Sequence, residues 1–412
     1  MKPLWGRVLE PDHPAVPPGS RTGLESGFKK PHSKSPRKPN PRRPPIKPFP
    51  HLHLLCFLAT ALPAACPADT LFRIDSPQPH EVFQRQSETS GVIRVSGTAS
   101  AGPVDVRVDE GEWKPVVVQA EGGRFSAGLT VAAKGWHRVE IRPPGGEVRR
   151  IEPVGVGEVF IVAGQSNAGN YGSERQRSES GMVSSFDGKA WQTCQDPQPG
   201  AGGGGGSFLP ALGDALATAY GVPVGFAACA SGGTSVRQWL PEGAEMTQQP
   251  TTGTLVRSVR PGVWASNGQL FAALERHLLH FGTNGVRAVL WHQGESDAGQ
   301  ARAGYPADRQ ISGEHYRVFM EQLIGASRER AGWRVPWIVA LATYHSESDA
   351  ADEEFRTAQR SLWKAGLACE GPDSDALRGD LRDGVHFNAK GLREHGKRWA
   401  EKILLLHPQS TP

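Results

Sequence analysis

From residue 154 onward the chain alternates short apolar runs with longer amphipathic stretches, and this alternation constrains the fold more than any other feature. Four apolar runs stand at 158–163, 222–228, 286–291 and 337–343. Stretches of helical character lie between and after them, at about 207–220, 267–281, 313–331, 351–366 and 389–406. Strands that alternate with helices of this length form a mainly parallel sheet with helices on both faces. We therefore predict a three-layer α/β/α fold of the flavodoxin-like kind over 154–408.

A second pattern precedes this region and predicts a separate domain over 69–153. Polar and apolar residues alternate at 92–97, 104–108 and 137–142, with Gly and Pro between these runs. Period-two alternation with frequent turns is typical of a small β-sandwich. The segment carries no catalytic set, so we expect a packing or spacer domain. Carbohydrate binding through Trp113 and Trp136 is the alternative, because sugars stack on indole rings.

The first 68 residues differ in composition from the rest of the chain. Residues 1–50 contain 13 Pro, 11 Lys or Arg and 3 Asp or Glu, too little apolar surface to fold, so we expect a disordered lead or a start site assigned too far upstream. The apolar run from Leu52 to Ala65 within 51–68 is too short to span a bilayer but suits a signal peptide. Cleavage near Ala65 or Ala68 predicts a secreted or periplasmic protein. Lipid anchoring at Cys66 is a weaker alternative, because Pro63 fits a lipoprotein signal poorly.

Charge and cysteine content exclude several classes of protein. The whole chain carries a formal net charge of +4, but residues 51–412 carry −4, which argues against a nucleic-acid partner. No apolar run after the signal-like segment reaches 18 residues, so we expect no membrane span. The cysteines show no zinc spacing, and neither a metal nor another cofactor is predicted. Cys194 and Cys229 are the candidate pair for a single disulfide, with Cys369 left over.

Reactive side chains follow the predicted strands, where ligands bind in open parallel sheets. Ser166 comes directly after the first strand, within Gly164-Gln165-Ser166-Asn167-Ala168. A serine at a strand-to-loop turn can expose its hydroxyl and leave its own N–H free for an oxyanion. Taken alone, such a serine is as well explained as a helix cap.

The loops after the next two strands add groups that stabilise negative charge. Gly232 and Gly233 follow the second strand, and paired glycines let backbone N–H groups point at a ligand. His292-Gln293-Gly294-Glu295-Ser296-Asp297 follows the third strand. So many polar groups at a strand end are hard to explain by packing, and the Gln293 amide could donate to an oxyanion.

A fourth loop supplies a base. Asp383-Gly384-Val385-His386 stands just before the last helix. An aspartate three residues before a histidine can bind its Nδ1 and leave Nε2 free to accept the serine proton. With Ser166 and the glycine loop, this histidine completes a nucleophile, a base, an orienting acid and oxyanion donors.

These motifs, in this order, resemble SGNH hydrolases, and most closely the sialate O-acetylesterases and the acetylxylan esterases of carbohydrate esterase family six. The resemblance covers about 154–395 and rests on 158–168, 232–234, 292–295 and 383–386. It implies a metal-free serine esterase that removes O-acetyl groups from sialic acid or xylan-type glycans through an acetyl-serine intermediate. The alternatives are an SGNH esterase or lipase acting on another acyl ester, and an inactive carbohydrate-binding protein.

The resemblance also assigns roles to particular residues. It implies Ser166 as nucleophile, His386 as base and Asp383 as the orienting acid, with Glu295 as its rival or helper. The oxyanion hole is expected from the N–H groups of Ser166 and Gly233, or Gly232, and from Gln293. Gln293 stands where simpler members carry asparagine. The residues predicted to bind substrate are Gln165, Asn167, Thr234, His292 and Trp239.

Overall fold

The computed structural model describes residues 72–100, 102–250, 253–300 and 304–407, which belong to one compact unit, Cys66–Pro412. The predictions for 1–50, for the signal-like segment 51–68 and for lipid anchoring at Cys66 fall outside the described residues. Within the described part of the chain, no helix is both long and apolar enough to cross a bilayer.

The first described segment consists of strands that pair mainly antiparallel, with β2 (Val82–Gln84) parallel to β8 (Arg149–Gly164). One three-stranded sheet contains β1 (Arg73–Ser76), β3 (Ser90–Thr98) and β6 (Arg124–Ala132). A second group contains β4 (Val104–Val108), β5 (Lys114–Val116) and β7 (Trp136–Arg142), together with β2 (Val82–Gln84) and the start of β8 (Arg149–Gly164). Alternate residues of β3, among them Ile93 and Val95, are fully buried against Val106 and Ile141, which is why period two marks this segment in the sequence.

Both tryptophans considered for sugar binding make contacts within the protein. The guanidinium groups of Arg107 and Arg142 lie over the Trp113 ring, each 4.5 Å from its centroid. The Trp136 indole donates a hydrogen bond of 2.9 Å to the Gly181 carbonyl. Because sugar stacking needs a free ring face, these contacts favour a structural role for Trp113.

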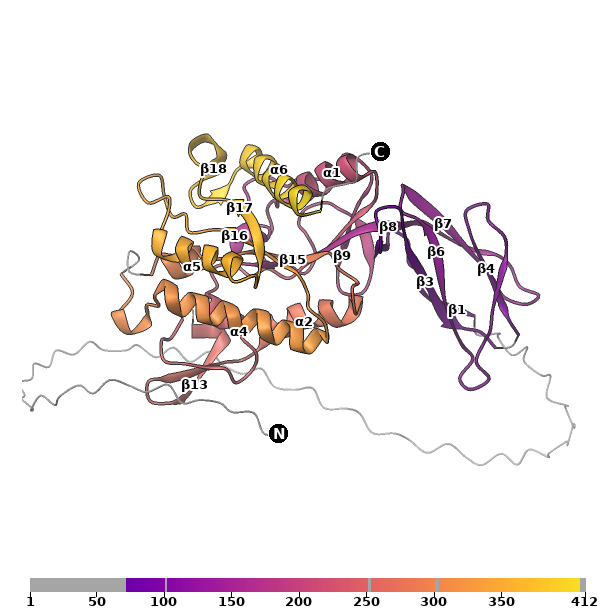
Figure 1. Ribbon diagram of the computed structural model, residues 1–412, viewed down its shortest axis with the longest axis horizontal. Helices are drawn as coiled ribbons and strands as arrows, with labels where there is room; N and C mark the ends of the chain where they lie inside the picture. The colour runs from indigo at the N-terminus through magenta and orange to yellow at the C-terminus, as the bar shows by residue number, and fades with distance from the viewer. Residues whose placement is uncertain (1–71, 101, 251–252, 301–303, 408–412) are drawn as a thin grey trace, which may run out of the picture. The chain divides into compact units, whose positions relative to one another are not determined.

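A mostly parallel sheet forms the centre of the remaining chain (Figure 1). Its order is β10 (Trp191–Thr193), β9 (Val183–Phe186), β11 (Val224–Ala228), β8, β15 (Ala288–His292), β16 (Trp337–Leu341) and β17 (Cys369–Asp373). From β9 to β17 all neighbours pair in parallel, and only β10 runs antiparallel at the edge. Smaller antiparallel pieces are β12 (Glu245–Met246), β13 (Val256–Arg260), β14 (Val263–Ser266), β18 (Arg382–Asp383) and β19 (His386–Phe387).

Helices cover both faces of this sheet (Figure 1). One face carries α1 (Leu209–Tyr220) and α6 (Ala389–Leu406), and the other carries α2 (Gln269–Phe281), α4 (Gly313–Ala331) and α5 (Glu353–Lys364). A short helix, α3 (Glu295–Ala298), follows β15. Along β8, Phe160 and Val162 pack under α1 and α6, whereas Val159 and Ile161 pack under α2 and α4. Burial on both faces explains why the strand reads as an unbroken apolar run, and the predicted α/β class is confirmed.

The start of β8 belongs to the group of strands that contains β4, β5 and β7, and its end lies in the parallel sheet. A buried cluster of charged side chains holds the middle of this strand in place. The Glu158 carboxylate binds the Nε atoms of Arg85 and Arg287, each at 2.6 Å, and accepts from the Gln84 amide at 3.0 Å. Glu158 is 1% exposed. The predicted boundary between 153 and 154 falls inside this continuous strand, so the domain limits stay predictions.

Replacing this carboxylate should destabilise the fold. In Glu158→Gln, the buried Arg85 guanidinium loses its counter-charge, and we expect the free energy of unfolding to fall by about 3–5 kcal/mol. Urea denaturation followed by circular dichroism measures the change. Glu110→Gln is the matched control, because the Glu110 pair with Arg138 is exposed and screened by solvent. Equal stability of Glu158→Gln and the wild type would contradict this account.

Candidate active site

A cavity of about 300 Å³ lies at the carboxyl ends of the central strands. Six residues predicted as site residues line it: Gln165, Ser166, Asn167, Gly233, Glu295 and His386. They come from the loops after β8, β11 and β15 and from the β18–β19 hairpin. The fold therefore brings together in one place the groups that the sequence placed in four separate loops, three after predicted strands and one before the last helix.

The backbone after β8 positions Ser166. Gly164 has φ +133°, and a Cβ there would lie 2.1 Å from the His292 carbonyl oxygen, so only glycine permits this approach of β8 to β15. The Gln165 N–H donates to the same carbonyl at 2.9 Å, and Ser166 then begins a 3₁₀ turn, Ser166–Ala168. Neither the hydroxyl nor the N–H of Ser166 bonds to another described residue. Both groups are therefore available to a ligand.

The glycine loop after β11 offers a second free N–H. Gly233 has φ +67°, is exposed and lines the cavity, and its N–H makes no hydrogen bond within the described part of the chain. Gly232 has a different function, since a Cβ there would lie 2.4 Å from the Tyr171 hydroxyl oxygen. Gly233 presents its backbone to the cavity, and Gly232 makes room for a tyrosine.

His386 stands on a two-stranded hairpin in which its backbone pairs with Asp383. Its imidazole packs against the Tyr171 ring, with 5.5 Å between ring centroids and 31° between ring planes. Burial lowers the pKa of His386 below its ordinary value of 6.5. The Glu295 and Asp383 carboxylates oppose this shift, while Arg382 adds to it. At neutral pH the imidazole is therefore neutral and can accept a proton.

Glu295 is a buried carboxylate beside the cavity. Its Oε1 accepts from the Asn167 amide at 3.0 Å and lies 3.2 Å from His292 Nε2. Burial alone would raise the pKa of Glu295, but the His292 charge and the hydrogen bonds from His292 and Asn167 outweigh it, and the pKa falls to about 2. Its Oε2 has no partner among the described residues. The Asn167 amide also donates to the Val385 carbonyl at 3.1 Å, and thus ties Glu295 to the hairpin of His386.

The two candidate acids differ sharply in environment. Glu295 is 5% exposed, whereas Asp383 is exposed to solvent. In the described structure the Asp383 side chain makes no hydrogen bond to His386. Asp383 therefore acts on the imidazole through solvent-screened charge, and Glu295 acts through a desolvated one.

Gln293 is not placed as an oxyanion donor. Its Nε2 donates to the Thr234 carbonyl at 3.0 Å and to Asp297 Oδ2 at 2.7 Å. Both amide protons are thus used, and the side chain is fully buried outside the cavity lining. The structure corrects the prediction: Gln293 ties the glycine loop after β11 to the loop after β15, and does not face a ligand.

Three of the five predicted substrate-binding residues, Thr234, His292 and Trp239, are buried without lining the cavity. Trp239 is 0% exposed and packs edge-on against Trp291, with ring centroids 5.2 Å apart, so it is a core residue. Thr234 accepts a 3.0 Å bond from the Trp239 indole and is 2% exposed. His292 is 1% exposed and contacts His395. The prediction that these three bind substrate is wrong, because none reaches the cavity.

Sequence reasoning missed five cavity-lining residues: Tyr171, Ser296, Tyr344, His345 and Val385. Ser296 and Val385 lay inside motifs already identified, but no motif marked the other three. Tyr171 could have been suspected from the run 202–206, whose glycines pack against its loop; a Cβ at Gly203 would lie 2.3 Å from the Asn170 carbonyl oxygen. Tyr344 and His345 come shortly after β16, the fourth predicted strand. A position just beyond the end of a predicted strand is the signal that could have indicated them.

The remaining cysteine and metal predictions concern residues away from this cavity. Cys194, Cys229 and Cys369 are free thiols, so the candidate disulfide between Cys194 and Cys229 is not present. Burial raises the pKa of the Cys194 and Cys229 thiols to about 12. No group of three His, Cys, Asp or Glu side chains suited to a metal ion occurs in the described part of the chain.

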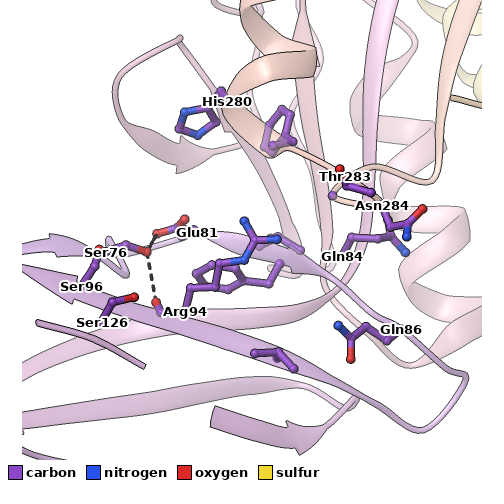
Figure 2. Close-up of a pocket in the computed structure, with 15 residues that line it drawn as sticks. Ser76, Glu81, Gln84, Gln86, Arg94, Ser96, Ser126, His280, Thr283 and Asn284 are labelled. Carbon is purple, nitrogen blue, oxygen red and sulfur yellow. Dashed lines mark hydrogen bonds between the residues drawn. The ribbon is translucent and has the colours of Figure 1, made fainter. Parts of the chain in front are cut away.

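A second cavity, of about 380 Å³, contains none of the predicted site residues (Figure 2). Strands of the β-rich segment and the end of α2 line it. Ser76 Oγ donates to the Arg94 carbonyl at 3.1 Å and contacts Glu81 Oε2 at 3.3 Å. Burial raises the pKa of Glu81 to about 7. None of the four sequence motifs contributes a residue to this cavity, so it is not the candidate catalytic site.

The family profile described as carbohydrate esterase, sialic acid-specific acetylesterase matches residues 156–405. The chain belongs to this family. It is therefore a carbohydrate O-acetylesterase, a carboxylic ester hydrolase. The matched range includes every residue that lines the cavity, and a search for related curated proteins found no match.

Solved structures with partial likeness include other carbohydrate esterases. A carbohydrate acetylesterase from Xanthomonas citri is 17% identical, with a TM-score of 0.48, over 79% of this chain and 73% of that one. An Arabidopsis thaliana protein is 19% identical, with a TM-score of 0.41, over 60% and 98%. A family two carbohydrate esterase from Cellvibrio japonicus is 12% identical, with a TM-score of 0.35, over 82% and 98%. The family membership rests on the sequence match alone.

The electrostatics of the site predict the titration of His386. The pKa of its imidazole should lie below 6.5 in the wild type. Glu295→Gln should lower the pKa of His386 further, because the carboxylate that raises it is gone. Asp383→Asn should lower it less, since Asp383 is exposed. NMR titration of the histidine ring protons measures all three values. A higher pKa in Glu295→Gln would contradict the assignment.

Proposed function

We propose that this esterase removes acetyl groups from carbohydrate hydroxyls through an acetyl-serine intermediate, with Ser166 as nucleophile and His386 as base. The observation that carries the proposal is the convergence in one cavity of Ser166, His386 and two free backbone N–H groups from separate loops. No hydrogen bond joins Ser166 to His386 in the described structure, and such bonds often form only when substrate is bound.

The proposed reaction begins when Ser166 Oγ attacks the acetyl carbonyl carbon and His386 accepts the hydroxyl proton. The carbonyl oxygen becomes an oxyanion, which accepts hydrogen bonds from the N–H groups of Ser166 and Gly233. When the intermediate collapses, the sugar oxygen leaves with the proton from His386. A water molecule then attacks the acetyl-enzyme, with His386 again as base, and acetate leaves.

We assign the main counter-charge of the His386 imidazolium to Glu295. Its carboxylate is buried, ionised and the largest charge acting on His386, and its Oε2 is unpaired. Asp383 acts as a weaker helper, because a charge exposed to solvent is screened. This assignment chooses between the two acids that the sequence left open.

The cavity favours a small acyl group on a polar substrate. Its volume of about 300 Å³ is at the lower end for ligand sites and would not enclose a long acyl chain. Polar side chains that include Gln165, Ser296 and His345 line it, as suits recognition of sugar hydroxyls. We propose sialic acid O-acetyl esters as the first substrate class, in line with the family description, and xylan-type esters as the second. Secretion through the signal-like segment 51–68 is part of the same proposal.

Ser166→Ala should abolish acetate release from p-nitrophenyl acetate and from acetylated glycans. Loss of the nucleophile typically costs roughly 10⁶-fold in kcat. Ser231→Ala is the matched control: this serine lies in the neighbouring glycine loop, and its side chain makes no hydrogen bond to a described residue. Full activity in Ser166→Ala would overturn the proposal. The relative rates of the wild type on the acetylated glycans would identify the substrate class.

The two carboxylates can be separated kinetically. We expect Glu295→Gln to lower kcat by about 10²-fold or more with little change in KM, because the charge acts in the transition state and not in ground-state binding. Asp383→Asn should cost less than about tenfold, since its charge is screened by water. Steady-state kinetics at a fixed pH above 7 measure both effects. The reverse order would make Asp383 the principal acid.

A further inference from the structure

A chain of buried aromatic nitrogens lies behind Glu295. His292 Nδ1 is 3.0 Å from His395 Nε2, and the Trp399 indole Nε1 is also 3.0 Å from His395 Nε2. On its other side, His292 Nε2 is 3.2 Å from Glu295 Oε1. His292, His395 and Trp399 are each at most 1% exposed. No role in the proposed reaction has so far been given to any of the three.

The indole fixes the protons in this chain. An indole N–H can only donate, so His395 Nε2 must be the unprotonated, accepting nitrogen. A neutral His395 then carries its proton on Nδ1, and burial keeps it neutral by lowering its pKa well below 6.5. His292 Nδ1 faces this same acceptor and must therefore carry a proton of its own. If His395 Nε2 carried a proton and donated it to His292 instead, its N–H would face the indole N–H of Trp399 at 3.0 Å.

The second nitrogen of His292 also faces acceptors. Glu295 Oε1 is the nearer, and Ser374 Oγ lies 3.4 Å away. The Ser374 hydroxyl already donates to the Leu341 carbonyl at 2.7 Å, so it too can only accept from His292. Both ring nitrogens of His292 thus face groups that need a proton from it.

We propose that His292 is a resident imidazolium, and that it acts as a positioning residue by keeping the buried Glu295 carboxylate ionised beside His386. The inference rests on the proposed function, in which ionised Glu295 balances the charge that forms on His386. A carboxylate removed from water is otherwise driven towards its protonated form. The imidazolium supplies the opposing charge at Glu295 Oε1 and does not itself line the cavity, and Glu295 Oε2 keeps no hydrogen-bond partner among the described residues.

One other cation acts on Glu295, because the carboxylate charge raises the pKa of the Arg382 guanidinium against the effect of burial. Arg382 donates its hydrogen bonds to the carbonyl groups of Leu377, Val385 and Ser374, and makes none to Glu295 in the described structure. His292 is thus the cation in direct contact with the carboxylate. Tyr316 on α4 stays neutral, since burial raises its pKa, and Asp297 on α3 accepts from Ser235, the Val236 N–H and Gln293.

Nitrogen NMR of the full-length protein labelled with ¹⁵N-histidine tests the proton directly. At pH 8 histidines with an ordinary pKa are neutral, so we expect one imidazole that still carries protons on both nitrogens. This signal should disappear in His292→Gln and persist in His277→Gln, a matched loss of another buried histidine, on α2. A wild-type spectrum without such a ring would overturn the proposal, whether or not a variant folds.

The pH dependence of kcat/KM for p-nitrophenyl acetate tests the effect on Glu295. The acid limb of the wild type is set by His386, because the pKa of Glu295 is only about 2. In His292→Gln the burial of Glu295 is no longer opposed by the cation in contact with it, so we expect Glu295 to stay protonated to a pH above this limb, which moves the limb up by about one pH unit or more and leaves KM unchanged. His277→Gln should keep the wild-type profile. An unmoved acid limb in folded His292→Gln would refute the positioning role.

A second variant protects the test against misfolding. Trp399→Phe removes the donor that fixes His395, so the doubly protonated ring should lose a proton at lower pH than in the wild type. An unchanged ring would contradict the proton assignment. Because the NMR signal needs no ester, the two proposals fail separately: signal without esterase activity would reject the proposed function, and activity without the signal would reject the imidazolium.

Discussion

The close approach of β8 to β15 at their carboxyl ends is the constraint on which the site depends. Gly164 pairs with His292 in the parallel register, and the missing Cβ at Gly164 allows this contact. Directly after these paired residues, the chain leads to Ser166 beyond the end of β8 and to Glu295 beyond the end of β15. The nucleophile and the buried carboxylate are neighbours because two rigid strands, and not flexible loops, bring them together.

Electrostatics then divide the cavity into a neutral base and a fixed anion. Burial holds His386 neutral, while hydrogen bonds and an adjacent cation hold Glu295 ionised. A base that is neutral before the reaction becomes a cation during it. An anion that is already in place stabilises this cation without any rearrangement of the site. The tilted packing of the Tyr171 ring against His386 and the two hydrogen bonds of the Asn167 amide hold His386 and Glu295 in position, and neither contributes a charge.

Much of this architecture was predictable, because buried parallel strands leave continuous apolar runs. The helices at 313–331 and 389–406 agree with α4 and α6 to the residue. The strand ends located Ser166 and Glu295, and the Asp383–His386 pattern before the last helix located His386. β17 (Cys369–Asp373) was missed because its sequence, CEGPD, contains two charged residues, a glycine and a proline and has no apolar period. Its place in the sheet comes from pairing with β16.

Side-chain direction was the part that sequence could not supply. Gln293, Thr234 and Trp239 belong to the motifs or lie near them, but which face of a loop a side chain takes depends on partners distant in sequence, such as the Thr234 carbonyl for Gln293. Tyr171 shows the converse: no motif contains it, yet it packs on His386 because Gly232 leaves space for its ring.

The most direct test of the central claim is covalent labelling of the folded protein with a fluorophosphonate, a reagent that phosphonylates activated serine hydroxyls. Peptide mapping by mass spectrometry locates the label. The account predicts a single modified residue, Ser166, with labelling much slower once His386 is replaced by alanine. A label on another serine, or none on a folded protein, would contradict the assignment of this cavity as the active site.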